Sequence, residues 1–547
     1  MLKNIKNSII QLLSFKSASV TIVLIALCSR VVQLFFFFNI RVDGMYQYLA
    51  MKYFVAGHGV SIAEVLAENL SVPVYELLIN WPPGYSILLS PLYVLFNDNY
   101  VAAGLTLDIL AATALIIFSR KILRLLEIPV HLVNIYTLFS GLFIYNFYFI
   151  ASSDAIAISL YVIAVHQTIL LLKTKSKWFF RTGLISILLI SCGLIKYLFY
   201  PVVFVIPVFL ITKGLIHKLP LQKKAGYISL ILITVALVSL LLYQKKISGA
   251  AGYISQPERG IFPENLSFAY PFIPGSIINP ESITKAISRL KTAESLIFST
   301  FQLIHIFSIV AIFICIILWV RKKGFRNFTL INSFYTISIL ISFVIVALLT
   351  ILSLTVAKEE INPGVMWSYI EDARYHGLIT VLFQICLFII IHQLIISDNK
   401  KWRFILILIP LFLLPETFRG LFFDANRIHK INTEEYSWQQ ELSIQKYADA
   451  IIAGKRRSIP FTHTAVTGTS YYVNYRVCIF SDAFYLKNTK AIYEEQGLKS
   501  AENVLLLYII ETNKVESQKS SIEKGRFDYE GSLKGYNFYS KLINKTK

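Results

Sequence analysis

The sequence predicts a polytopic α-helical membrane protein with about 11 transmembrane helices, interfacial helices in its first outer loop and a small C-terminal extracytoplasmic α/β domain. Of its 547 residues, 56% are hydrophobic and only 15% are charged, and the mean hydropathy is +0.62. A soluble protein carries about a quarter of charged residues. This chain therefore has too little polar surface to cover itself in water, and lipid must surround most of it.

The candidate spans are apolar runs close to the roughly 20 residues that an α-helix needs to cross a bilayer. They cover residues 18–40, 100–119, 129–150, 154–172, 180–195, 198–213, 226–243, 296–319, 330–356, 374–396 and 403–418. No internal repeat is apparent, which does not favour a transporter built from inverted repeats.

The charge distribution orients these spans. The net charge of +20 comes from 52 Lys and Arg against 32 Asp and Glu. With a cytoplasmic N-terminus, every inner loop is basic, as in Arg120–Arg124 and Arg321–Lys323, whereas acids such as Glu359 and Glu360 gather in outer loops. This positive-inside pattern predicts a multi-pass protein of the cell (inner) membrane with its C-terminal domain outside. It also explains the basic charge without a nucleic-acid partner.

The sequence divides into two predicted domains. A transmembrane domain covers residues 1–420 and includes the first outer loop, 41–99, whereas a soluble α/β domain covers 421–547. The soluble domain is expected because residues 436–454 have helical periodicity and residues 464–480 and 503–510 resemble strands.

The first outer loop is too polar to cross lipid and too aromatic for a simple linker. Residues 45–57 predict an amphipathic surface helix, and residues 82–96 predict a second short apolar helix that begins with two prolines. Asp43 stands where the first span leaves the membrane, so its carboxylate is expected at the edge of a low-dielectric region, which would raise its pKa.

These residues resemble a known family. The sequences "RVDGMYQYLAMKYFVAGHGVS" and "NWPPGYSILLSPLYVLF" are similar to the first outer loop of the GT-C superfamily of polytopic glycosyltransferases, in the bacterial branch related to protein O-mannosyltransferases and the lipid A aminoarabinose transferase. Two shorter stretches around Asp154 and Arg374, and "GLIKYLFYP", resemble further family positions. The family often places a second acid beside the first, and Gly44 stands there in this chain, which removes one candidate metal ligand.

The resemblance implies a GT-C fold and transfer of a sugar, with inversion, from a polyprenyl-phosphate donor to a hydroxyl of a glycan, lipid or protein acceptor outside the membrane. It implies the catalytic residues Asp43, as general base, and Asp154; the donor phosphate-binding residues Arg374, Lys196 and Tyr375; and the substrate-cavity residues Tyr46, His58, Trp81 and Tyr197. No cofactor is expected, because a lipid carrier brings the activated sugar. A divalent metal is not indicated, and the five cysteines lack the CxxC spacing of a zinc site.

Structural alternatives exist for most of these residues. One alternative for Asp43 and Asp154 is that each caps a helix. For Arg374 the alternative is a local ion pair with Glu371 or Asp372. Lys196 would then reach toward lipid headgroups, and His58 would have a structural role. The intramembrane Arg30 and Asp108 are expected to pair with each other, because an isolated charge in a membrane span is costly.

Other functions fit the same class of membrane protein. A lipid-linked-sugar flippase or polysaccharide transporter would place paired charges within several spans. A ligase or polymerase of O-antigen type would depend on arginines and a histidine in a large late outer loop. The concentration of polar groups at one membrane face favours the glycosyltransferase, and the number of spans is too large for the anchor of a binding protein.

Overall fold

The structure is a computed structural model. It describes residues 16–37, 42–66, 69–143, 153–174, 176–249, 310, 317, 329–355, 373–396, 405–430, 437–459, 461, 463–468, 483–485 and 504–543.

The chain forms two compact units. The first contains Met1–Phe36, Asp108–Leu242 and Tyr253–Ile431, and the second contains Phe37–Leu107, Tyr243–Gly252 and Asn432–Lys547. The sequence assigns the first outer loop to the transmembrane domain. In the structure this loop belongs to the same unit as the C-terminal region.

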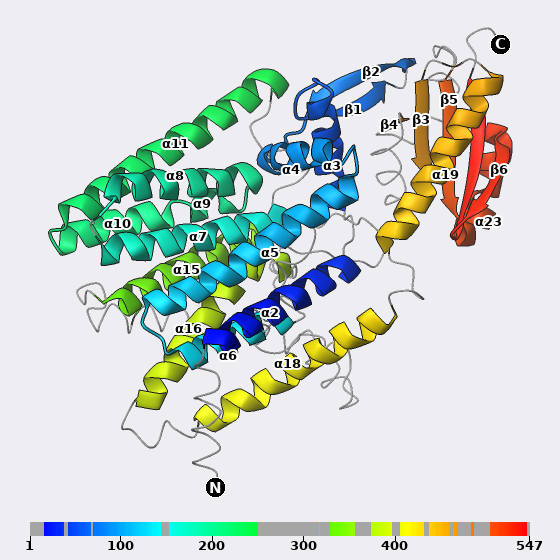
Figure 1. The fold of residues 1–547 in the computed structure, drawn as a ribbon. Helices are drawn as coiled ribbons and strands as arrows, with labels where there is room; N and C mark the ends of the chain where they lie inside the picture. Colours follow the sequence, from blue (N-terminus) through cyan, green and yellow to red (C-terminus); the bar gives the residue numbers. More distant parts are fainter. Residues whose placement is uncertain are drawn as a thin grey trace. The chain divides into compact units, whose positions relative to one another are not determined.

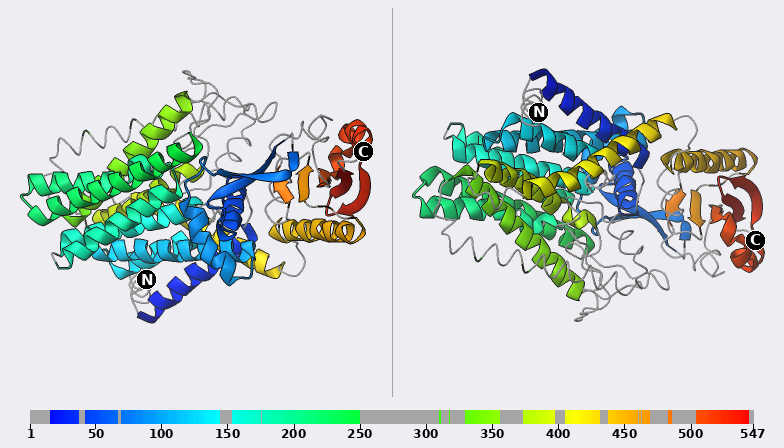
Figure 2. Two further views of the ribbon diagram at one scale, coloured as in Figure 1. Left: turned by 90° about the horizontal axis from the view of Figure 1, so that it is seen from above. Right: turned by 90° about the horizontal axis from the view of Figure 1, so that it is seen from below.

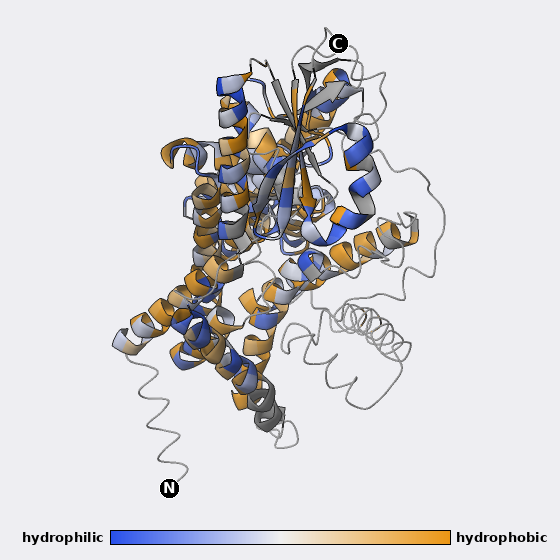
Figure 3. Ribbon diagram, turned by 90° about the vertical axis from the view of Figure 1, so that its right-hand side faces the viewer, coloured by the Kyte–Doolittle hydropathy of each residue, from blue (hydrophilic) through white to orange (hydrophobic). Residues whose placement is uncertain are grey.

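Long apolar helices make up the first unit (Figures 1 and 3). Its described helices are α2 (Lys16–Phe37), α5 (Tyr100–Leu125), α6 (Val130–Leu142), α7 (Ser153–Lys173), α8 (Trp178–Ile195), α9 (Phe199–Val202), α10 (Val205–Ile216), α11 (Pro220–Ser248), α15 (Leu330–Thr355), α16 (Gly377–Ile396) and α18 (Ile405–His429). Three of them, α2, α5 and α11, extend into the second unit. Within the described residues, eight helical segments are long and apolar enough to cross a membrane. The protein is therefore a multi-pass membrane protein.

Most predicted spans coincide with these helices. The run 154–172 corresponds to α7, and 330–356 corresponds to α15. The run 198–213 is divided between α9 and α10, and most of 296–319 lies outside the described residues. The full number of spans stays a prediction.

Two glycines allow close helix packing in the first unit. A Cβ atom at Gly141 of α6 would collide with the Cα and Cβ atoms of Ala26 in α2. A Cβ atom at Gly420 of α18 would collide with the carbonyl oxygen of Leu142. Small residues at such positions let helix backbones approach each other in a membrane, where packing drives helix association.

The predicted pairing of Arg30 with Asp108 is wrong. Arg30 donates hydrogen bonds to Gln33 Oε1 at 2.6 Å, to the Phe143 carbonyl at 3.0 Å and to the Ser140 carbonyl. Its partners are thus α2 itself and the carbonyl groups at the end of α6, which lack partners within their own helix. Neither carboxylate oxygen of Asp108 has a hydrogen-bond partner among the described residues.

The acid near Arg30 comes from α18 instead. Ser29 donates a hydrogen bond to Asp424 Oδ2 at 2.5 Å, and Gln33 donates one to Asp424 Oδ1 at 3.4 Å. This buried network joins α2, α6 and α18. Its sequence signal is weak, because Asp424 lies beyond the predicted end of the last span.

A seven-stranded mixed sheet forms the core of the second unit (Figure 1). Its strands, in the order β2-β1-β4-β3-β5-β7-β6, are β1 (Ser61–Leu66), β2 (Asn69–Leu77), β3 (His463–Gly468), β4 (Ala483–Tyr485), β5 (Val504–Glu511), β6 (Asp528–Leu533) and β7 (Tyr536–Ile543). The hairpin of β1 and β2 comes from the first outer loop. It joins the C-terminal strands through a parallel contact between β1 and β4, in which Glu64 is the register partner of Tyr485.

Helices cover both faces of the C-terminal part of this sheet. Ile509 is opposite Phe538, and Tyr508 is opposite Tyr539, so these two pairs point to opposite faces. Tyr447 of α19 (Ser437–Ser458) packs against Phe538 with ring centroids 4.8 Å apart. On the other face, α23 (Val515–Gly525) contributes Ile522 to a cluster with Tyr508 and Ile510.

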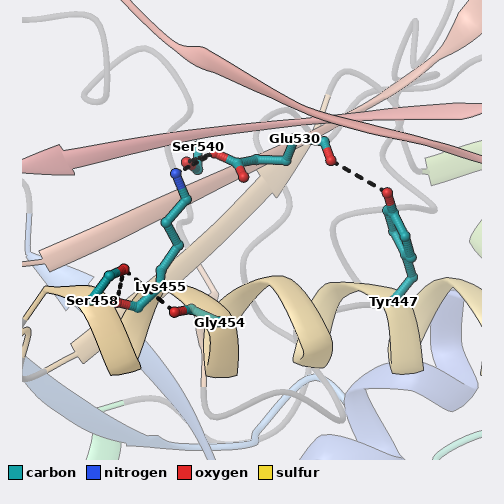
Figure 4. A network of polar contacts seen from close by, with 6 residues as sticks. All are labelled: Tyr447, Gly454, Lys455, Ser458, Glu530 and Ser540. Atoms are coloured by element: carbon teal, nitrogen blue, oxygen red, sulfur yellow. Dashed lines mark hydrogen bonds and ion pairs between the residues drawn. The ribbon is translucent and has the colours of Figure 1, made fainter.

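Both views of Figure 2 show α19 beside the C-terminal strands, and the close-up in Figure 4 shows the polar contacts that hold it there. Lys455 Nζ lies 2.6 Å from Glu530 Oε1, and Ser540 donates a hydrogen bond to the same oxygen at 2.5 Å. Tyr447 donates a hydrogen bond to the Glu530 carbonyl at 3.3 Å. The predicted helix 436–454 corresponds to α19, and the predicted strand 503–510 corresponds to β5. Of the strand predicted at 464–480, the first residues belong to β3, and residues 469–480 lie outside the described part of the structure.

The first outer loop adds two helices to the second unit. They are α3 (Val42–Val55) and α4 (Gly84–Leu95), which match the predicted surface helices. Ala50 of α3 packs with Val60 and Leu78 of the hairpin segment. The sequence pattern does not predict the hairpin. Residues 61–77 contain only four of the β-branched residues that favour strands, Ile62, Val65, Val72 and Val74.

Candidate active site

A buried ion pair joins two helices of the first unit. Lys196 Nζ lies 2.9 Å from Asp154 Oδ2, and the two side chains are 8% and 2% exposed. Asp154 is in the first turn of α7, where the helix dipole favours a negative charge. Lys196 directly follows α8 in an extended conformation, and its backbone N–H donates to the Cys192 carbonyl. The turn after α8 therefore places the ammonium group of Lys196 beside the first turn of α7.

Arg374 and Tyr375 lie beside this pair. They belong to the short 3-10 helix η3 (Ala373–His376), which directly precedes α16. Lys196 Nζ is 5.2 Å from the centroid of the Tyr375 ring, and Arg374 Cζ is 5.4 Å from it. Both distances are within the range of cation–π attraction. One aromatic ring therefore has two cations beside it, and Arg374 is only 7% exposed.

Close packing fixes the segments that carry these side chains. A Cβ atom at Gly377, the first residue of α16, would lie 2.6 Å from Ile158 Cδ1 of α7. Cys192 Sγ donates to the Ala157 carbonyl at 3.3 Å, which joins α8 to α7. Tyr161 of α7 donates to the Val202 carbonyl at 2.9 Å. Four predicted site residues that are far apart in the sequence thus come together in one rigid part of the bundle.

The cluster has the chemistry of an anion site. Arg can bind two oxygens of a phosphate through its planar fork, and Lys supplies a compact charge with three donors. The carboxylate of Asp154 accepts a hydrogen bond from the Lys196 ammonium group at 2.9 Å and so fixes its position. Lys196 therefore does not reach out to lipid headgroups, because its side chain is buried and paired.

The described part of the chain contains no side chains arranged as a metal site. No group of three His, Cys, Asp or Glu side chains is placed there to hold a metal ion.

Asp43 is the second residue of α3, in the second unit. Its side chain lies outside the described part of the structure, as do Glu371 and Asp372, the local partners considered for Arg374. The role of Asp43 as a general base stays a prediction.

Two predicted cavity residues of the first outer loop pack against each other. The rings of Tyr46 and Trp81 stack with centroids 4.9 Å apart and planes at 24°. Both also pack on the apolar cluster of Ala50, Val60 and Leu78. These contacts hold α3 against the hairpin segment, and this packing accounts for both aromatic side chains.

His58 and Tyr197 occupy different surroundings. The exposed His58 ring stacks on Tyr75 with centroids 3.8 Å apart. Burial raises the pKa of the Tyr75 hydroxyl, so this phenol stays neutral at pH 7. Tyr197 follows Lys196 in the turn after α8 and packs edge-on against Tyr200, with centroids 5.2 Å apart. Of these two residues, only Tyr197 is next to a residue of the buried cluster.

Comparisons with known proteins bear on the fold. No protein-family model matches the sequence, and no curated protein matches it. The crystal structure of ArnT from Cupriavidus metallidurans in the apo state is similar over 95% of this chain and 97% of that chain, with 12% identity and a TM-score of 0.52.

Two further crystal structures are similar at lower scores. The same Cupriavidus protein bound to undecaprenyl phosphate has 12% identity, coverage of 95% and 97%, and a TM-score of 0.43. The oligosaccharyltransferase of Archaeoglobus fulgidus tethered with an acceptor peptide has 11% identity, coverage of 96% and 76%, and a TM-score of 0.49. The TM-scores of these two structures are below 0.5, so the likeness in fold depends on the apo ArnT structure. The chain shares the overall fold of that apo ArnT structure.

Proposed function

We propose that this chain is a membrane glycosyltransferase that moves a sugar from a polyprenyl-phosphate donor to a hydroxyl of a glycan, lipid or protein acceptor. The observation that carries the proposal is the cluster of Lys196 and Arg374 around Tyr375. Two cations held in an apolar helical bundle suit a phosphate group that is attached to a lipid. The GT-C fold supports the same class of enzyme.

The proposed reaction uses these cations at the leaving group. The acceptor oxygen forms a bond to the anomeric carbon while the bond from that carbon to the phosphate oxygen breaks, which inverts the anomeric centre. The lipid phosphate leaves with the bonding electrons, and Arg374 and Lys196 stabilise its growing charge. Preorganised charges of this kind commonly give the largest contribution to catalysis. Asp154, predicted among the catalytic residues, acts by holding Lys196 in place.

Asp43 is the proposed general base. It takes the proton of the acceptor hydroxyl as the new bond forms. Its place in the sequence supports this role, because Asp43 stands where the first span ends, in the stretch that resembles the first outer loop of the GT-C glycosyltransferases. General-base catalysis contributes typically about 10²- to 10⁴-fold. The lipid carrier supplies an already activated sugar, so the proposed reaction uses no nucleotide cofactor.

The test compares glycolipids and glycoproteins, by mass spectrometry, from cells with the wild-type chain, with Asp43→Asn and without the chain. The expected result is a product that needs the chain and falls about 100-fold or more with Asp43→Asn. A matched control is Asp98→Asn, an exposed acid with a left-handed backbone that asparagine also adopts. Near-normal product from Asp43→Asn would reject Asp43 as the base. No product dependence on the chain would reject the glycosyltransferase and leave the transporter hypothesis.

We also propose the inner membrane as the location, with a cytoplasmic N-terminus and with the active site and C-terminal region outside. The basic inner loops of the sequence support this orientation. A disulfide-dependent alkaline phosphatase fused after Lys547 should be active, since its disulfides form only in an oxidising compartment outside the cytoplasm. An inactive fusion with normal expression would reverse the orientation.

A further inference from the structure

The helix α11 is the least buried of the eight candidate spans in the described part of the chain. Only 28% of its most apolar stretch lies inside the protein. Its exposed residues Ile231, Val235, Val238 and Leu242 are spaced three or four apart, so they lie on one face of the helix. This apolar face of α11 is therefore open to lipid.

Two pairs of lysines stand at the ends of the apolar part of α11. The first pair is Lys223 and Lys224, and the second pair is Lys245 and Lys246. The 20 residues between them, 225–244, carry no charge and extend about 30 Å as a helix, which is the thickness of a bilayer core. Both pairs therefore reach the headgroup layer. The two lysines of the second pair are exposed.

Contacts with α8 show that the second pair and Lys196 lie at the same end of two parallel helices. Ser186 of α8 donates a hydrogen bond to Ser229 of α11 at 2.9 Å. Further along both helices, a Cβ atom at Gly193 would lie 2.8 Å from Leu237 Cδ2. Because both residue numbers rise from one contact to the next, the helices are parallel. Lys196 directly follows α8, and the second pair directly follows the apolar part of α11.

The second pair is an exception to the charge distribution of this chain. In the proposed orientation it stands outside the membrane, where Lys and Arg are uncommon. The anionic groups that meet it at this level are lipid phosphates. A phosphate monoester carries nearly two negative charges and three acceptor oxygens at pH 7, and two ammonium groups match it. The phosphodiester of a phospholipid carries one charge and matches the pair less well.

We propose that Lys245 and Lys246 bind the phosphate monoester of a polyprenyl lipid whose chain lies along the apolar face of α11. Lys245 follows Leu242 by three residues, so the phosphate and the chain are in line along the helix. The monoester is the form of the carrier that remains when its sugar has left. The pair therefore collects the spent carrier on the side of the membrane where the proposed reaction releases it. This role rests on the proposed function, since that reaction supplies the monoester.

The test counts bound lipids by native mass spectrometry of the full-length protein in nanodiscs of neutral phosphatidylcholine, with undecaprenyl phosphate as the probe. Wild type is expected to bind one lipid at the cluster of Lys196 and Arg374 and a second at the lysine pair. Lys245→Gln with Lys246→Gln should weaken the second binding roughly 10- to 30-fold, because each lysine near a lipid phosphate contributes about a factor of five. An unchanged second binding, or no second binding in wild type, would overturn the proposal.

The matched control is Lys223→Gln with Lys224→Gln, the same charge change at the opposite end of α11. Lys223 Nζ lies 6.0 Å from the centroid of the Tyr227 ring, so that end presents one fully exposed lysine of the two. The control should leave the second binding unchanged. An equal loss in both double variants would show a general attraction of headgroups to lysine and would contradict the proposal.

Single variants keep the test decisive if the double variant of the second pair fails to fold. Lys245→Gln and Lys246→Gln should each weaken the second binding about fivefold. Misfolding of these variants as well would give the pair a structural role and overturn the proposal.

A second probe separates the polyprenyl lipid from ordinary phospholipids. Phosphatidylglycerol, a diester, should bind the lysine pair about fivefold more weakly than undecaprenyl phosphate, since it has one charge fewer. Equal affinities would assign the pair to phospholipids and reject its role toward the carrier.

None of these binding measurements uses a sugar or an acceptor, so their outcome is separate from that of the glycosylation test. Lipid binding that depends on the second pair, in a chain on which no product depends, would reject the glycosyltransferase and keep the lipid-phosphate site. A product that needs the chain, with a second binding that does not need the pair, would keep the glycosyltransferase and reject the site.

Discussion

The ammonium group of Lys196 lies 2.9 Å from the carboxylate of Asp154, and both side chains are buried. The pair connects the turn after α8 with the first turn of α7. Separating two charges from water is expensive unless the geometry is good and further contacts assist. The ring of Tyr375 provides such a contact for Lys196 at 5.2 Å. The pair is therefore a rigid support for the proposed phosphate site.

Removing one partner of this pair should destabilise the protein strongly. Lys196→Met leaves the Asp154 carboxylate buried without its cation, which typically costs about 3–5 kcal/mol. Thermal unfolding in detergent measures the effect. Lys173→Met is the control, because its pair with Glu127 has side chains that are 37% and 80% exposed and contributes about 0–1 kcal/mol. Equal unfolding temperatures for the two variants would contradict a structural role of the buried pair.

Substitutions of Arg374 should show whether its guanidinium group binds two phosphate oxygens or acts only as a positive charge. Arg374→Gln is expected to weaken binding of undecaprenyl phosphate roughly 10- to 100-fold, because hydrogen bonds to charged groups contribute about 1.5–3 kcal/mol. Arg374→Lys should recover only part of this loss, since Lys cannot bind two oxygens in parallel. Arg419→Gln is a control from α18, where the Arg side chain is 38% exposed. Unchanged affinity in Arg374→Gln would remove this residue from the site.

The glycine contacts of the first unit predict a packing effect. Gly420→Ala adds a methyl group where the Leu142 carbonyl already lies, and overpacking of this kind typically costs about 1–3 kcal/mol. Gly183→Ala in α8 is the matched control, because a Cβ atom there meets nothing within 4 Å. The control should be neutral or slightly stabilising, as alanine favours the helix. Denaturation of both purified variants measures their free energies of unfolding. Equal stability would contradict the close contact between Gly420 of α18 and the Leu142 carbonyl.

The joint between the first outer loop and the C-terminal strands can be tested by cross-linking. Glu64 and Tyr485 are register partners in β1 and β4, so cysteines at these positions should form a disulfide. Peptide mass spectrometry after mild oxidation detects it. The pair Glu64→Cys with Asp528→Cys is the control, because β6 is five strands from β1, roughly 24 Å away. Cross-linking of the control alone, or of neither pair, would contradict the seven-stranded order.

Several elements follow from local sequence patterns. The apolar run 154–172 becomes α7, and the strand-like residues 503–510 become β5. The proline-led helix predicted at 82–96 is α4. Each of these elements is recognisable because its hydrophobic period or length is a property of neighbouring residues. The hairpin of β1 and β2 lacks so clear a local pattern, since its second strand contains Pro73.

The partner of the buried Arg30 could not be identified from local sequence patterns. The sequence suggested Asp108 as the partner of Arg30, because each is a rare charge inside an apolar run. In the structure the Arg30 guanidinium caps the carbonyl groups at the end of α6, and Asp424 of α18 completes the network through Ser29. Charge complementarity within a membrane requires a partner. It does not specify which segment supplies that partner.

The sequence by itself determined that lipid surrounds most of this chain and where many of its helices begin and end. Those properties arise from the length and charge of continuous segments. Only the tertiary structure decided that Asp154, Lys196, Arg374 and Tyr375 meet, and that strands from the two ends of the chain share one sheet. These contacts depend on how whole helices and strands pack, which a local pattern does not encode.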